Sequence, residues 1–220
     1  MHRRAIGLIL VLLVLAGLTF ALWPGLDLAT SRLFFVGGRF IGEGPPGNAA
    51  RFVGWFLPAC VLIGALAGWL ARLAGIRAPS LPQTRTALYL ALTMALGPGL
   101  LVNVVLKDHW HRPRPVQVTQ FGGHFTFRPW DRLDGACVRN CSFVSGEASS
   151  ATWMLAPALL VPAPLTGPAV AASLVFGAAV GFLRITFGGH FLSDTLFSML
   201  LTALVILLLH RLMWRGKQPD

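Results

Sequence analysis

Three short polar segments in an otherwise apolar chain carry the residue types that can do chemistry. They read KDHWHRPRP at 107–115, SFVSGE at 142–147 and RITFGGHFLSD at 184–194. Together they contain one of only two lysines in the chain, several arginines, a Ser-Gly-Glu step, and a histidine followed four positions later by an aspartate. Basic side chains that bind oxyanions, next to a histidine that can act as a nucleophile, indicate the handling of a phosphate group.

The third segment supplies the nucleophile. His190 and Asp194 are spaced i, i+4, which places them on one face of a helix. Asp194 is expected to accept a hydrogen bond from one imidazole nitrogen and to leave the other free to attack. The alternative is a His–Asp pair that only caps a helix. Ionisable groups at membrane-spanning segments are costly and usually functional, which favours the catalytic interpretation.

The first two segments supply candidate phosphate ligands. Lys107 and Arg114 are a point charge and a planar fork, both suited to phosphate oxygens, and Arg112 competes with Arg114 for that role. Ser145 and Gly146 precede a predicted helix, whose first backbone N–H groups favour an anion. Ser145 can cap the same helix, and the two roles are compatible.

Apolar segments must position these residues. The chain is 55% hydrophobic and 12% charged, whereas about 25% is usual for soluble domains. We predict an all-α, polytopic membrane helix bundle that forms a single domain over 1–220, with its three-motif core at about 107–194. The six expected spans are Ile6–Trp23, Phe52–Ala71, Ala87–Leu106, Ala148–Val161, Pro168–Phe187 and Phe191–Met213. The first is interpreted as an uncleaved anchor because no clean cleavage site follows it.

The net charge of +10 does not indicate nucleic-acid binding, because the basic residues flank alternate ends of the spans. With six spans, one side of the membrane receives Arg3, Arg4, Arg72, Arg77, Arg85, Arg211, Arg215 and Lys217. The positive-inside rule makes that side cytoplasmic. Both termini are then cytoplasmic, and the three polar segments face the outside, which in a bacterial inner membrane is the periplasm.

The loops carry further expectations. A periplasmic location is compatible with a disulfide between Cys137 and Cys141, although four-residue spacing suits bridge geometry only sometimes. A metal site is less favoured, because no histidine pair follows at zinc-ligand spacing. The segment 24–51 begins with an amphipathic stretch suited to the membrane interface, with an ordinary connecting loop as the alternative. Gly97-Pro98-Gly99 predicts a bend in the third span.

The three segments, in this order, resemble the type 2 phosphatidic acid phosphatase superfamily, which includes bacterial lipid phosphatases and, more distantly, vanadium haloperoxidases. The pattern of that superfamily is Lys, six residues, Arg-Pro; then Pro-Ser-Gly-His; then Ser-Arg, five residues, His, three residues, Asp. Lys107, Arg114 and Pro115 match the first motif, and Arg184, His190 and Asp194 match the third at both spacings.

The resemblance implies a role for each matching residue. His190 would attack phosphorus and become a phosphohistidine, and Asp194 would orient it. The phosphoryl oxygens would be held by Lys107, Arg114 and Arg184, together with backbone N–H groups near Gly146. No metal and no cofactor are implied. The expected partners are a phosphorylated membrane lipid and the bilayer.

The second motif departs from the pattern, because Glu147 stands where the family has the histidine that protonates the leaving group. Val144 and Leu183 are smaller departures. Three explanations stay open: Glu147 is the acid; one of His109, His111 or His124 replaces it; or the leaving group needs little protonation. The last leads to the hypothesis that Glu147 tilts preference toward diphosphate lipids, because phosphate is a weaker base than an alkoxide.

A membrane lipid phosphatase is therefore the leading interpretation. A lipid phosphotransferase would use the same phosphohistidine step, and a catalytically silent headgroup binder would retain only the phosphate ligands. The candidate lipids are phosphatidic acid, phosphatidylglycerol phosphate, a polyprenyl diphosphate and lipid A.

Overall fold

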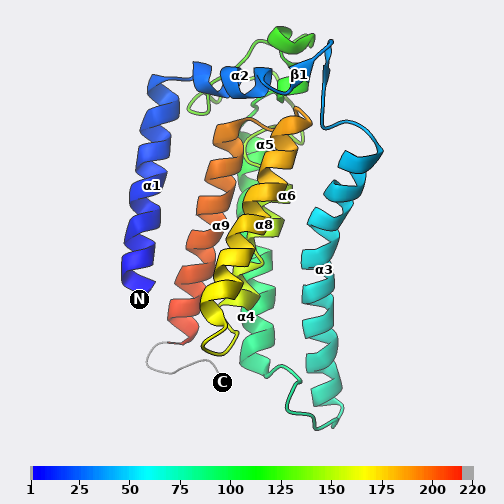
Figure 1. The fold of residues 1–220 in the computed structure, drawn as a ribbon. Helices are drawn as coiled ribbons and strands as arrows, with labels where there is room; N and C mark the ends of the chain where they lie inside the picture. Colours follow the sequence, from blue (N-terminus) through cyan, green and yellow to red (C-terminus); the bar gives the residue numbers. More distant parts are fainter. Residues whose placement is uncertain (1, 215–220) are drawn as a thin grey trace.

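The computed structural model describes residues 2–214 and is mostly helical, as expected (Figure 1). Its long helices are α1 (His2–Leu22), α3 (Pro45–Leu73), α4 (Thr84–Met94) with its continuation, α8 (Thr166–Thr186) and α9 (Leu192–Met213). Within the described residues, five helices are long and apolar enough to cross a membrane. They correspond to five of the six predicted spans. Arg215 and Lys217, expected on the cytoplasmic side, lie outside the described residues.

The fourth predicted span is not one long helix. Residues 146–158 form two short helices, α6 (Gly146–Thr152) and α7 (Leu155–Ala158), separated by a turn at Trp153 and Met154. Trp153 is fully buried, and its indole donates a hydrogen bond to Thr93 Oγ1 at 2.9 Å. Interrupted backbone is tolerated at membrane depth where protein surrounds it. The predicted continuous helix over 148–161 is therefore replaced by a broken segment inside the bundle.

The third predicted span changes its helical form where a bend was expected. α4 continues as a π-helix over Ala95–Leu106, and a single turn, α5 (Lys107–His109), follows. Pro98 lies inside the π-helix, and its carbonyl accepts a hydrogen bond from the Asn103 amide at 2.7 Å. Proline has no backbone donor, and π-helical segments often occur at functional sites. This one leads directly into Lys107.

The segment after α1 lies across one end of the bundle (Figure 1). It contains α2 (Gly25–Arg32) and a hairpin of β1 (Phe35–Val36) and β2 (Arg39–Phe40), which pair antiparallel. Gly37 and Gly38 form the turn with φ of 59° and 79°, a conformation that favours glycine. Leu33 and Val36 are exposed on this segment, as an interfacial element requires.

The loop that precedes α6 packs onto the same end of the bundle. It includes two 3₁₀ turns, η2 (Pro115–Gln117) and η3 (Thr119–Phe121). Trp110, Trp130 and Phe197 pack with Phe143, and the Trp130 indole donates to Gly17 O in α1 at 3.1 Å. The aromatic residues of this loop therefore fix it to the helices.

A second group of basic residues lies at the end of the bundle opposite the three polar segments. α1 begins and α9 ends at the same end of the bundle, and the loop from α3 to α4 lies there too (Figure 1). That end carries Arg3, Arg4, Arg72, Arg77, Arg85 and Arg211. The three polar segments meet at the opposite end.

Candidate active site

The turn between α8 and α9 holds His190. Gly188 has a φ of 60°, and a side chain there would collide with Phe40. A Cβ on Gly189 would collide with the Arg184 guanidinium. The two glycines thus allow the turn to pass close over Arg184, and His190 follows with 2% exposure.

The partner of the His190 ring is a backbone carbonyl. Nδ1 lies 2.6 Å from the Ser142 carbonyl oxygen and 4.0 Å from Asp194 Oδ2. The direct hydrogen bond predicted between His190 and Asp194 is therefore absent. A carbonyl can only accept, so Nδ1 carries the proton and Nε2 keeps its lone pair. The tautomer expected for a nucleophile follows from Ser142 instead.

Asp194 is connected to His190 through Ser142. Its Oδ2 accepts hydrogen bonds from Ser142 Oγ at 2.5 Å and from Phe191 N at 2.8 Å. Because Ser142 and the backbone of Phe191 already donate to this carboxylate oxygen, the imidazole of His190 bonds to the Ser142 carbonyl instead. Ser142 links the two, because its hydroxyl donates to Asp194 and its carbonyl accepts from His190.

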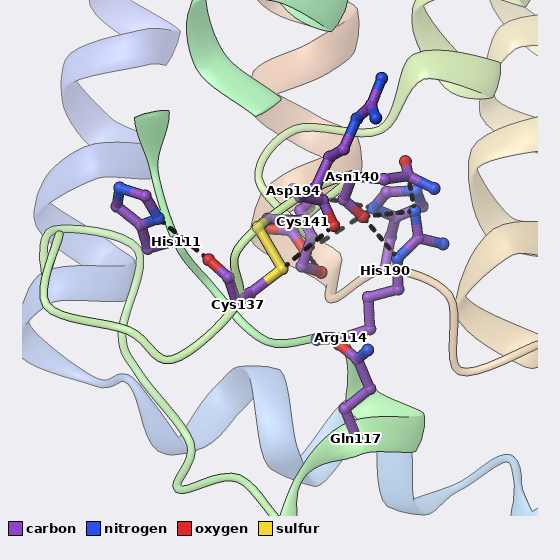
Figure 2. Close-up of a disulfide and its surroundings, with 10 residues drawn as sticks. His111, Arg114, Gln117, Cys137, Asn140, Cys141, His190 and Asp194 are labelled. Atoms are coloured by element: carbon purple, nitrogen blue, oxygen red, sulfur yellow. Dashed lines mark hydrogen bonds and ion pairs between the residues drawn. A yellow bond between two sulfur atoms is a disulfide. The ribbon is translucent and has the colours of Figure 1, made fainter. Parts of the chain in front are cut away.

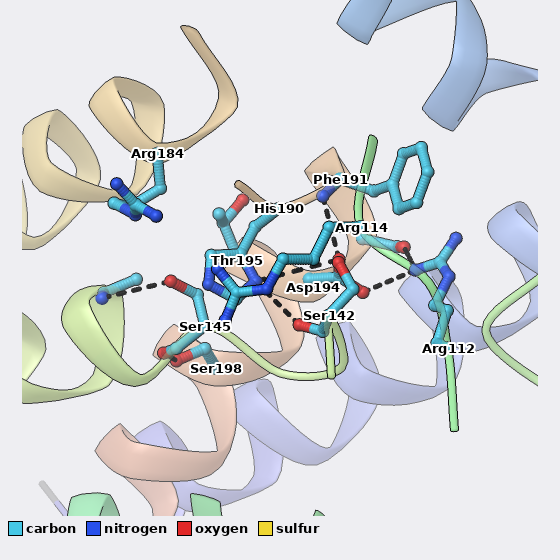
Figure 3. Close-up of polar contacts among 12 residues, drawn as sticks. Arg112, Arg114, Ser142, Ser145, Arg184, His190, Phe191, Asp194, Thr195 and Ser198 are labelled. Atoms are coloured by element: carbon cyan, nitrogen blue, oxygen red, sulfur yellow. Dashed lines mark hydrogen bonds and ion pairs between the residues drawn. The ribbon is translucent and has the colours of Figure 1, made fainter. Parts of the chain in front are cut away.

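Arg112 lies on the opposite side of Asp194 from Arg184 and His190 (Figure 3). Its Nη1 lies 2.5 Å from Asp194 Oδ1, and its Nη2 lies 2.7 Å from Asp27 Oδ2 on α2. Burial acts to lower the pKa of Arg112, but the two carboxylates raise it above its ordinary value. The suggestion that Arg112 competes with Arg114 for phosphate is therefore wrong: Arg112 is fully buried between two aspartates.

Asp27 is a residue that the sequence analysis missed. It is 1% exposed, and it accepts hydrogen bonds from Ser193 N at 2.9 Å and Ser193 Oγ at 2.6 Å. Asp27 is the sole acidic residue before Glu43 in the sequence. An isolated acid in an amphipathic stretch was the signal that could have identified it.

Three basic side chains lie close enough to His190 to affect its charge. Burial lowers the pKa of His190 well below its ordinary value, and the positive charges of Arg114, Lys107 and Arg184 lower it further. The imidazole is therefore neutral near pH 7, as a nucleophile must be. The structure thus brings the predicted cations of the first and third segments to one place.

Arg184 has buried donors that make no hydrogen bond among the described residues. It is 3% exposed, and neither Nε nor Nη1 makes a hydrogen bond to any described residue. The nearest carboxylate oxygen, Glu147 Oε1, lies 3.5 Å from Nε. Buried guanidinium donors rarely stay unsatisfied, so these two are suited to an anionic ligand.

Ser145 and Gly146 begin α6 beside Lys107. Ser145 Oγ accepts a hydrogen bond from Ala148 N at 3.3 Å, so the predicted N-cap is present. A Cβ on Gly146 would lie 3.2 Å from Lys107 Nζ and 2.6 Å from Asn103 Oδ1. Glycine therefore permits the close approach of Lys107 to the start of α6.

Glu147 faces two arginines. Its carboxylate accepts hydrogen bonds from Arg51 at 2.7–3.0 Å and lies beside Arg184. An ionised carboxylate only accepts, so in this state Glu147 cannot protonate a leaving group.

The alternative acids make no hydrogen bond or ion pair with the site among the described residues. His109 Nδ1 lies 2.8 Å from Val105 O, and His111 Nδ1 lies 2.9 Å from Cys137 O. His111 is on the other side of the disulfide from His190 (Figure 2). His124 is exposed.

Cys137 and Cys141 form a disulfide with a Cα–Cα distance of 5.7 Å. The loop they close presents Asn140, whose φ is 53°. Arg114 Nη2 donates to Asn140 O and Asn140 Oδ1, both at 2.9 Å, and Nε donates to the same carbonyl at 3.1 Å. The disulfide loop therefore orients Arg114 beside His190 (Figure 2).

Reducing this disulfide is expected to lower activity, because Asn140 would no longer hold Arg114 in place. We expect Cys141→Ser to lose about 2 kcal/mol of stability and roughly tenfold in kcat/KM. Phosphate release and thermal unfolding before and after dithiothreitol treatment measure both effects. Cys60→Ser is the control, since Cys60 is a free thiol on α3. An unchanged kcat/KM after reduction would contradict this role of Asn140.

Within residues 2–214, no group of three or more His, Cys, Asp or Glu side chains could hold a metal ion. The residues gathered around His190 are cationic donors instead. Such a set binds an anion and stabilises negative charge that develops on it.

Residues 86–218 match the PAP2 superfamily. The chain is also similar to curated bacterial proteins named lipid A 4′-phosphatase. It is 38% identical to that of Rhizobium leguminosarum over 204 residues, which cover 84% of this chain and 86% of the relative. It is 34% identical to that of Francisella tularensis subsp. novicida over 226 residues, which cover 99% of this chain and all of the relative. The Rhizobium etli protein is 37% identical over 191 residues, 80% of this chain and 74% of the relative. No solved structure matches the chain significantly.

Proposed function

The chain belongs to the PAP2 superfamily and is a membrane lipid phosphatase, and from this premise we propose that His190 removes a phosphate from a lipid A substrate through a phosphohistidine intermediate. The observation that carries the proposal is the buried Arg184 guanidinium, whose Nε and Nη1 make no hydrogen bond among the described residues, beside a neutral His190. Lys107 and Arg114 add two further positive charges that act on the ring.

In the first step, the lone pair on Nε2 of His190 attacks phosphorus. A P–N bond forms, the P–O bond to the lipid breaks, and the lipid oxygen leaves with the bonding electrons and takes up a proton from a water molecule. Asp194, acting through Ser142, keeps the proton on Nδ1 and so directs Nε2 at phosphorus. Lys107, Arg114 and Arg184 stabilise the charge that spreads over the phosphoryl oxygens.

In the second step, water attacks the phosphohistidine. The P–N bond breaks, inorganic phosphate leaves, and His190 regains its neutral form. A lipid phosphotransferase would differ only here, because a lipid hydroxyl would take the place of water. Hydrolysis releases inorganic phosphate, whereas transfer yields a labelled phosphorylated lipid, so measuring both products separates the two reactions.

The substrate proposal rests on the named relatives. All three are lipid A 4′-phosphatases, and one is matched over its whole length. We therefore place lipid A, among the candidate lipids, first. The preference for diphosphate lipids inferred from Glu147 stays a prediction.

The proposed location is a bacterial inner membrane, with the site at the periplasmic face and both termini in the cytoplasm. Two observations support this orientation. The basic residues of the α3–α4 loop lie at the end of the bundle away from His190 (Figure 1), as the positive-inside rule requires. A disulfide orients Arg114, and disulfides persist in the periplasm.

A lipid panel tests the proposed function. The purified protein in detergent micelles is expected to release phosphate from 4′-monophosphorylated lipid A at least about tenfold faster than from the isomer phosphorylated at position 1. Phosphatidic acid, phosphatidylglycerol phosphate and a polyprenyl diphosphate complete the panel. Equal rates on the two isomers would contradict the lipid A assignment, and fastest release from the diphosphate would support the Glu147 hypothesis instead.

A further inference from the structure

Arg51 is a charged residue that α3 brings to the candidate site. α3 is otherwise an apolar helix, and its charged residues are Arg51 near the site and Arg72 at the opposite end. Neither belongs to the three polar segments identified in the sequence. A charged side chain on a membrane helix is costly and usually has a function, so the contacts of Arg51 near the site are of interest.

The contacts of Arg51 are with Glu147. Arg51 Nη2 lies 2.7 Å from Glu147 Oε1, and Arg51 Nε lies 2.9 and 3.0 Å from the two carboxylate oxygens. Glu147 Oε1 is also the carboxylate oxygen nearest to Arg184 Nε, at 3.5 Å. One carboxylate therefore lies between two guanidinium groups, which is also how two arginines hold a phosphoryl group.

An aromatic side chain links the two arginines. The Arg184 guanidinium lies 5.3 Å from the centre of the Phe187 ring, and that of Arg51 lies 6.0 Å from it. The Arg51 side chain is 44% exposed and the Glu147 side chain 21%, whereas Arg184 is almost fully buried. An incoming anion can therefore reach Arg51 and Glu147 before it reaches Arg184.

The charge balance of the site favours an additional anion. Lys107, Arg114, Arg184 and Arg51 lie close enough for their charges to interact, and Glu147 forms ion pairs with two of these four cations. Asp194 is engaged by Arg112 on its other side. A phosphate dianion carries more charge and more acceptor oxygens than one carboxylate, so it can displace Glu147 from the arginines.

We propose that Arg51 is a further phosphate-binding residue of this site, and that Glu147 is its resident counter-ion, displaced by the substrate phosphate. This inference rests on the proposed function, and it assigns Glu147 a role other than general acid. Glu147 occupies the arginines while the site is empty and moves away when phosphate binds. Arg51 then contacts a phosphoryl oxygen together with Arg184.

A double-mutant cycle tests the proposal, with direct binding of inorganic phosphate to the purified protein in micelles as the first readout. Arg51→Gln is expected to weaken phosphate binding about tenfold. Glu147→Gln is expected to tighten it severalfold, because the competing carboxylate is removed. In the double variant, Arg51→Gln should still weaken binding relative to Glu147→Gln alone. Arg72→Gln is the matched control on the same helix and should leave binding unchanged.

Two results would overturn the proposal. If Arg51 only positions Glu147, then Arg51→Gln has no effect in the Glu147→Gln background. If Glu147 is a general acid, then Glu147→Gln lowers kcat by about 10²-fold or more and leaves phosphate affinity unchanged. The binding readout needs no lipid substrate. A failed lipid panel with the expected phosphate affinities would therefore reject the proposed substrate and keep the role of Arg51.

Discussion

Replacing His190 by alanine is expected to abolish phosphate release, with a loss of more than about 10⁴-fold in kcat. The reason is the loss of the nucleophile, since Nε2 is the ring atom left with a lone pair when Nδ1 donates to the Ser142 carbonyl. The remaining cations can bind phosphate but cannot form the P–N bond. The measurement is phosphate release under saturating lipid substrate, together with trapping of a ³²P-labelled protein at alkaline pH, where a phosphohistidine survives.

His111→Ala is the matched control for this prediction. His111 also binds a backbone carbonyl through Nδ1, at 2.9 Å from Cys137 O, but it lies across the disulfide from the site. We expect this variant to keep most of its activity and to form the labelled protein. Thermal unfolding of both variants shows whether they fold. A folded His190→Ala protein with full activity would refute the mechanism.

Replacing Arg112 by methionine is expected to cost about 3–5 kcal/mol of stability. Arg112 neutralises Asp27 and Asp194, and both carboxylates are at most 1% exposed. Without it, two negative charges remain buried and unpaired, which is far more costly than the loss of an exposed ion pair. Thermal unfolding in micelles, followed by tryptophan fluorescence, measures the change.

Arg128→Met provides the comparison, because Arg128 pairs with Asp134 at 3.5 Å in an exposed position. This variant should lose no more than about 1 kcal/mol. Asp27→Asn retains the Arg112–Asp194 pair and should fold even where Arg112→Met does not. Equal stability of the Arg112 and Arg128 variants would show that the buried cluster contributes little.

Much of the fold was predictable, because long apolar segments in a bilayer must be helical. The same argument could not predict the break between α6 and α7. Trp153 and Ala156 are as apolar in a broken, buried segment as they would be in a continuous helix. Hydropathy reports only that a segment is apolar, and the surrounding protein decides whether it stays one helix.

The candidate site was predictable where side-chain types and spacing carry the information. Lys107, Arg114, Arg184 and His190 meet at one end of the bundle because alternate spans return the chain to that end. The hydrogen-bond partner of His190 was not predictable, because it is a backbone carbonyl, and every residue has one.

The long-range ion pairs were equally hidden from the sequence. Arg112 and Asp27 are 85 positions apart, and Arg51 and Glu147 are 96 apart. Spacing rules apply within one helix or turn. Pairs between distant elements depend on how the helices pack, which a single sequence does not reveal.

The hydrogen bonds between Asp27 and Ser193 have a consequence for the order of biosynthesis. They join α2 to the start of α9 across 166 positions. A ribosome delivers α2 to the membrane long before it has made α9. Asp27 and Arg112 therefore lack their partners in α9, Ser193 and Asp194, until the last helix is inserted. A nascent chain therefore exposes its membrane helices while its hydrolytic centre is still incomplete, and a chain truncated before α9 is expected to be inactive.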